Sequence, residues 1–140
     1  MTRRKIREVI FKKLYETEIT GDTPVPEDSF YGDTFGEGVE ADENESEYIT
    51  NKTNAVLDKK EEIDSCIEET SSGWKVSRMS RVDLSILRLA VYEMLYDEEI
   101  PVGVAVNEAV ELAKEYGTDD SSAFINGILG NISRKKGLSD

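Results

Sequence analysis

Apolar residues recur at three- and four-residue intervals along most of the chain, which is the spacing of one face of an α-helix. Near the start of the chain this spacing joins Ile6, Val9, Ile10 and Leu14. We expect a helix here, with Lys5, Glu8 and Lys12 on its solvent side.

The middle of the chain predicts one long polar helix from about Tyr48 to Glu69, which Ser71, Ser72 and Gly73 then break. Its apolar positions are Ile49, Val56, Leu57, Ile63 and Ile67. Trp74 begins the next short segment.

The C-terminal half predicts three further helices, one of them apolar on nearly every side. That helix follows a capping box, Ser80-x-x-Asp83, and should form the centre of the core. A second should run from Val104 to Tyr116 and end at Gly117, with four inward residues: Val106, Ala109, Val110 and Ala113.

The last predicted helix follows Thr118, Asp119 and Asp120, any of which could cap it. Gly127 lies inside this helix and suggests a close crossing with a neighbouring helix. Its apolar positions are Phe124, Ile125, Ile128, Leu129 and Ile132. Because no strand pattern stands out, we expect an all-α fold with about seven helices.

A Gly-, Pro- and acid-rich stretch from about residue 20 to 47 interrupts the helical pattern. We interpret Gly21 to Glu47 as an acidic loop excursion, with Phe30, Tyr31, Phe35 and Val39 as isolated apolar residues. A calcium loop starting at Asp42 does not fit, because Glu47 stands where the required glycine belongs and Thr53 where the bidentate glutamate belongs.

The length of 140 residues suits one domain, so we treat residues 1–140 as a single unit at this stage. Histidine is absent and Cys66 is the only cysteine, which argues against most nucleophilic enzymes, zinc ribbons and disulfide scaffolds. No signal peptide or membrane span is apparent. We therefore expect a cytoplasmic protein that is not an enzyme and needs no cofactor or metal.

The charge is segregated along the chain. The formal net charge is −13, yet residues 1 to 14 hold six basic side chains and one acidic. Arg4, Arg7, Phe11 and Tyr15 share one flank of the first predicted helix, where rings could stack on RNA bases and guanidinium groups could meet phosphates. The alternatives are that the charges only solvate the helix and that Phe11 and Tyr15 are core residues.

The chain from Arg81 to Gly130 resembles the C-terminal part of the NusB family of bacterial transcription antitermination factors. The resemblance rests on NEAVELAK, from Asn107 to Lys114, and on F-x-NG-x-L, from Phe124 to Leu129. Arg7, followed by Leu14 and Tyr15 at this spacing, resembles the pattern in the first helix of that family.

This resemblance implies an all-helical body of two small packed bundles that binds the boxA RNA of ribosomal RNA leader transcripts. It also implies NusE, a small-subunit ribosomal protein, as a partner within the RNA polymerase antitermination complex. A homodimer and a monomer both remain open.

The resemblance also assigns candidate residues. For RNA these are Arg3, Arg4, Lys5, Arg7, Asp120 and Phe124. For NusE they are Tyr15 and Asp83.

Two other functions fit parts of the sequence. The same helical domain occurs fused to RNA cytosine methyltransferases, but this chain has no Gly-rich cofactor loop after it. The second is a protein-only helical adaptor whose basic N-terminus binds an acidic partner.

Overall fold

The computed structural model describes residues 1–21 and 42–138, which form six α-helices and one short 3-10 helix, with no strand among them. The all-α prediction is confirmed. The chain divides into two compact units, Met1–Asp58 and Lys59–Asp140. Among the described residues no helix combines the length and apolar character needed to cross a membrane.

The first unit pairs α1 (Arg3–Thr20) with α2 (Glu43–Asp58). Thr2 begins α1, since its hydroxyl accepts a hydrogen bond from the Lys5 backbone N–H at 3.1 Å. Val9, Ile10 and Leu14 are buried as predicted. Lys12 is buried as well, so its expected place on the solvent side was wrong.

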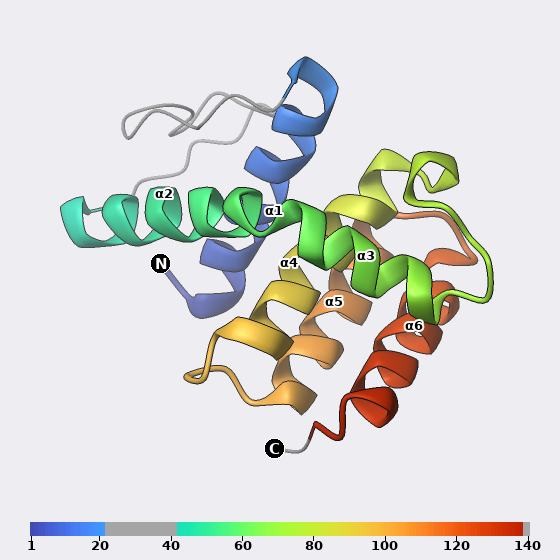
Figure 1. The fold of residues 1–140 in the computed structure, drawn as a ribbon. Coiled ribbons are helices and arrows are strands. Elements are labelled where there is room, and N and C mark those ends of the chain that lie inside the picture. Colours follow the sequence, from blue (N-terminus) through green and yellow to red (C-terminus); the bar gives the residue numbers. More distant parts are fainter. Residues whose placement is uncertain (22–41, 139–140) are drawn as a thin grey trace. The chain divides into compact units, whose positions relative to one another are not determined.

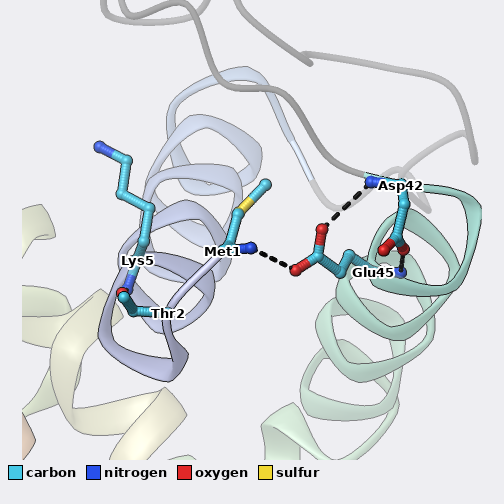
Figure 2. Close-up of polar contacts among 5 residues, drawn as sticks. All are labelled: Met1, Thr2, Lys5, Asp42 and Glu45. Carbon is cyan, nitrogen blue, oxygen red and sulfur yellow. Dashed lines mark hydrogen bonds and ion pairs between the residues drawn. The ribbon is translucent and has the colours of Figure 1, made fainter.

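The helix α2 begins earlier than predicted, because an acidic capping box starts it (Figure 2). The Glu45 N–H donates to the Asp42 carboxylate at 2.7 Å, and Glu45 accepts from the Asp42 N–H at 3.1 Å. Residues 43–47, expected in the loop, are therefore helical. The other residues of the predicted excursion, apart from Gly21 and Asp42, lie outside the described residues, including Phe30, Tyr31, Phe35 and Val39.

The single long helix predicted for the middle of the chain was also wrong. The chain there forms α2 and a separate α3 (Lys60–Thr70), which are divided at Lys59. After α3, Ser72 and Gly73 take positive φ angles of 58° and 91° and turn the backbone sharply. The 3-10 helix η2 (Val76–Arg78) follows.

The second unit is built around α4 (Arg81–Tyr96), which contacts α3, α5 (Val102–Tyr116) and α6 (Ser121–Lys135) (Figure 1). The predicted capping box is present, because the Asp83 N–H donates to Ser80 Oγ at 3.0 Å. The side chains of α4 that are at most 2% exposed include Leu84, Ile86, Leu87, Leu89, Ala90 and Val91. The expectation that this helix is the centre of the core is confirmed for the second unit.

Two polar contacts fix α3 in this unit. Arg88 of α4 makes a bidentate pair with Asp64 of α3, at 2.9 Å from Nε and 2.8 Å from Nη2. Asn131 of α6 donates to the carbonyl of Thr70 at 3.3 Å, which satisfies one of the last carbonyl groups of α3. The start of the following loop is therefore held in place.

Two expectations for the C-terminal helices were wrong. On α5, Ala109 and Ala113 are buried, but Val106 and Val110 are only half-buried. On α6, Gly127 is exposed, and a Cβ added there would meet nothing within 4 Å. Gly127 therefore marks no close helix crossing within the described part of the chain.

Candidate nucleic-acid interface

In the first unit, the basic residues gather at the N-terminal end of α1. Arg3 and Arg4 are exposed, and Lys5 is half-buried with its Nζ 2.8 Å from Glu8. The first turn of α1 contains no acidic residue, so the positive end of the helix dipole adds to these charges. This end of α1 can attract phosphate.

Arg7 is less accessible to solvent than the sequence suggested, because only 8% of its surface is exposed. Phe11 is 3% exposed, so the core interpretation holds for this ring and it cannot stack on a base. Tyr15 is half-buried. Of the basic candidates on α1, Arg3 and Arg4 are thus the most accessible to a phosphate.

Besides Glu8, the acidic side chain of Glu45 stands near the start of α1 within the first unit (Figure 2). The N-terminal ammonium of Met1 donates to Glu45 Oε2 at 2.5 Å. The pKa of Glu45 is lowered first by this hydrogen bond and then by the one from the Asp42 backbone. Glu45 therefore keeps its charge near the start of α1 at neutral pH.

In the second unit, Trp74 and Phe124 form an aromatic pair. Their ring centroids lie 5.8 Å apart in an edge-to-face arrangement, with 73° between the ring planes. Trp74 is 49% exposed, so much of the indole stays open to a ligand. Sequence reasoning named Phe124 but missed Trp74, although the only tryptophan next to Lys75 was a visible clue.

The loop that carries Trp74 is held by hydrogen bonds. Ser71 Oγ donates to the carbonyl of Trp74 at 2.8 Å, and Glu68 Oε2 accepts from the Val76 N–H at 2.9 Å. Lys75 and Arg78 follow Trp74 closely in the chain and are exposed. An exposed ring on a fixed loop can stack a single-stranded base, and exposed cations of the same segment can meet its phosphate.

Phe124 is positioned by the tight turn between α5 and α6. A Cβ at Gly117 would come within 2.5 Å of Ser121, so this position requires glycine. The Thr118 N–H donates to Ser121 Oγ at 2.9 Å and closes the turn. Gly117 ends α5 as predicted, with its N–H bonded to the carbonyl of Ala113.

Asp120 stands at the N-cap position of α6, but its side chain makes no capping hydrogen bond. It is exposed, and Phe124 follows it by one helical turn. The capping role considered for it is therefore wrong, and its carboxylate is open to accept a hydrogen bond from a ligand.

Asp83, the candidate partner-binding residue, has one buried carboxylate oxygen, Oδ1, without a hydrogen-bond partner in the described structure. Such an oxygen lacks the donor that usually compensates its lost hydration. Tyr15, the other candidate, is half-buried on α1 in the first unit.

The candidate RNA residues are likewise divided between the units. Arg3, Arg4, Lys5 and Arg7 share α1 in the first unit, and Asp120 and Phe124 share the start of α6 in the second, where the structure adds Trp74. The described residues contain no cluster of three or more potential metal ligands.

The model of the NusB family matches residues 4–134. The chain is 47% identical over 139 residues to the transcription antitermination protein NusB of Acetivibrio thermocellus, covering 99% of this chain and 93% of that protein. It is 44% identical to NusB of Agathobacter rectalis, covering 94% and 99% of the two chains.

Solved structures show the same fold. NusB of T. maritima superposes with a TM-score of 0.79 at 32% identity, covering 96% of this chain and 92% of that one. A chain from the structure of antitermination factors NusB and NusE in complex with double-stranded RNA gives a TM-score of 0.76 at 27% identity, covering 96% and 99%.

Proposed function

Because this chain belongs to the NusB family, we propose that it is a transcription antitermination factor that binds boxA RNA of ribosomal RNA leader transcripts together with NusE. In this role it promotes read-through by RNA polymerase. It acts in the cytoplasm, by binding and without a catalytic step.

The observation that carries the RNA part of the proposal is the aromatic pair in the second unit. Trp74 is fixed by its loop and contacts the ring of Phe124 edge to face, and about half of its own surface stays exposed. Stacking of a base on an exposed aromatic ring contributes about 1–3 kcal/mol. Single-stranded boxA RNA supplies unpaired bases for this stacking.

The basic end of α1 supplies the electrostatic part. Arg3 and Arg4 are exposed in a chain of net charge −13, so a short RNA meets locally positive charge while an extended duplex meets repulsion. Asp120 then suits recognition, since a carboxylate accepts a hydrogen bond from a base amino group.

The NusE part rests on Tyr15 and Asp83. Both candidates come from the resemblance to the family, and both residues are half-buried, so part of each stays accessible to a partner. The structure with NusE and double-stranded RNA contains a relative of this fold.

Charge reversal at Arg3 and Arg4 tests the proposal. The double variant Arg3→Glu and Arg4→Glu should weaken binding of a boxA oligonucleotide and reduce the slope of log K against log salt by about one to two units. Both side chains are exposed, so the fold should survive. Fluorescence anisotropy at several salt concentrations measures the slope.

A control for the position of the charge is Lys114→Glu, which reverses one exposed charge near the end of α5. It should leave the slope unchanged. A double variant with the wild-type slope would contradict the assignment of Arg3 and Arg4 to phosphate.

A further inference from the structure

Gly127 lies in the interior of α6, and nothing in the described structure requires a glycine there. The residue is exposed, and a Cβ added to it would meet no atom within 4 Å. Its backbone is helical and does not take a positive φ angle. Alanine would therefore fit this position without a clash and without backbone strain.

This glycine lowers the stability of α6. A glycine inside a helix loses more backbone entropy on folding than alanine does, so alanine is the more stable residue at an open helical position. Gly117 differs, because Ser121 leaves no room for a Cβ there. Packing among the described residues does not account for Gly127, whereas close approach of a ligand to the helix backbone does.

Gly127 lies on the face of α6 that carries two of the candidate RNA residues. It follows Phe124 by three residues and Asp120 by seven, and these spacings place all three on one side of a helix. Asp120 is exposed and Phe124 is half-buried, so this side of the helix is accessible.

The segment that follows α3 contacts α6 both before and after Gly127 along the helix. The two helices pack against each other (Figure 1). Trp74 contacts Phe124, three residues before Gly127, and the Thr70 carbonyl accepts a hydrogen bond from Asn131, four residues after it, at 3.3 Å. The helix backbone at Gly127 is thus held in place next to the aromatic pair, with open space over it.

A nucleotide suits this space. The rise from Phe124 to Gly127 is about 4–5 Å, comparable with the ~3.4 Å spacing of stacked bases, so a base on the Trp74 ring brings its own ribose or the next one to Gly127. Close packing of a ribose on the bare backbone gains dispersion energy that a gap of one methyl group removes. The neighbouring ring favours RNA as the occupant, because unpaired bases stack on exposed rings.

From these contacts we propose that Gly127 is a contact residue of the RNA site, where the ribose next to the base stacked on Trp74 packs directly against the backbone of α6. This inference rests on the proposed RNA-binding function. It adds a contact that depends on shape, whereas the contacts of Arg3 and Arg4 depend on charge.

Two substitutions in the complete protein test it, Gly127→Ala and the larger Gly127→Gln. Gly127→Ala should raise the melting temperature by about 2–4 °C, because it removes the entropy cost of the glycine. It should nevertheless weaken binding of a boxA oligonucleotide by about tenfold, since added atoms overfill a close contact, and Gly127→Gln should weaken binding further. Thermal melts and anisotropy titrations measure the two effects.

The matched control is Gly130→Ala, which makes the same change one turn later in α6. Gly130 lines the open groove between α5 and α6, and a Cβ there would meet the Arg134 guanidinium at 3.4 Å, an ordinary contact. This variant should change RNA binding by less than twofold. An equal loss in Gly130→Ala would overturn the inference, because the loss would then follow from replacing any glycine of this helix.

Unchanged RNA binding by both Gly127 variants would overturn the inference and leave the proposed function intact. A lower melting temperature for Gly127→Ala would overturn it too, because the fold itself would then require the glycine. Weaker binding of NusE with unchanged binding of RNA, each measured alone, would show that a protein occupies the position instead. Failure of the wild-type protein to bind the boxA oligonucleotide would overturn the proposed function, and the inference with it.

Discussion

Lys13 shows how a single residue of α1 can depart from its sequence pattern. Only 1% of its surface is exposed, and burial lowers its pKa to about 8 from the ordinary 10.5, although Glu16 acts in the opposite direction. Burial thus stabilises the neutral amine relative to the charged form, compared with a lysine in water. Helical periodicity alone could not reveal this, since a long aliphatic stem lets a lysine occupy an apolar position.

This burial predicts a pH-dependent stability. Between pH 8 and 10.5 the unfolded chain binds more protons at Lys13 than the folded protein, so the free energy of unfolding should rise with pH through this window. Below pH 8 the lysine is charged in both states, and the full cost of burying the charge is present.

Lys13→Met should therefore raise the free energy of unfolding at pH 7, by on the order of 1–3 kcal/mol, and should remove the rise between pH 8 and 10.5. Urea denaturation at pH 7 and pH 9.5 measures both effects. Lys114→Met, at an exposed position, should change neither. A variant that is less stable than the wild type at pH 7 would show that the contacts of the lysine outweigh its desolvation.

Asp120 gives a second prediction at this scale. Because its side chain is exposed and caps nothing, Asp120→Asn should leave the melting temperature nearly unchanged. Removing one negative charge beside the RNA should give equal or tighter binding at low salt, and any gain should shrink as salt screens it. The amide oxygen of asparagine can accept the hydrogen bond from a base amino group in place of the carboxylate, so recognition is kept. A tenfold loss of binding with unchanged stability would contradict this and show that the charge itself is required.

At the scale of the helices, the sequence predicted most of the structure through apolar spacing and end residues. The helix α4 was recognised because its apolar run follows Ser80 and Asp83, and both the cap and the burial are confirmed. The end of α5 at Gly117 was also predicted, although the close approach of Ser121 that requires glycine there depends on three-dimensional packing.

The start of α2 was missed because its acidic composition hid a capping box. Asp42 and Glu45 satisfy each other's backbone N–H groups, and this local hydrogen bonding outweighs the weak apolar pattern of residues 43–47. The division at Lys59 was missed for a different reason, since neither glycine nor proline marks it in the sequence.

The candidate site was predicted in part. The arginines at the start of α1 could be found from charge, and Arg3 and Arg4 are exposed as an RNA contact needs. The contact between Trp74 and Phe124 could not be found, because it joins residues 50 positions apart through the packing of the second unit. The half-buried positions of Val106 and Val110 on α5 likewise depend on which face of that helix packs into the core.

At the scale of the whole molecule, the proposed function couples two ligands, RNA and NusE. If both bind the folded protein and each favours the binding of the other, each must raise the affinity for the other by the same factor. Coupling of this kind typically amounts to about 5–150-fold. A protein-only adaptor would bind its partner with no such dependence on RNA.

The most direct test is a titration of the complete protein with boxA RNA, in the presence and absence of NusE. A scrambled RNA of the same length and a duplex serve as comparison ligands. We predict salt-dependent binding of boxA RNA that exceeds binding of both comparison ligands and tightens at least fivefold when NusE is present. Equal binding of boxA and scrambled RNA under both conditions would contradict the proposed function.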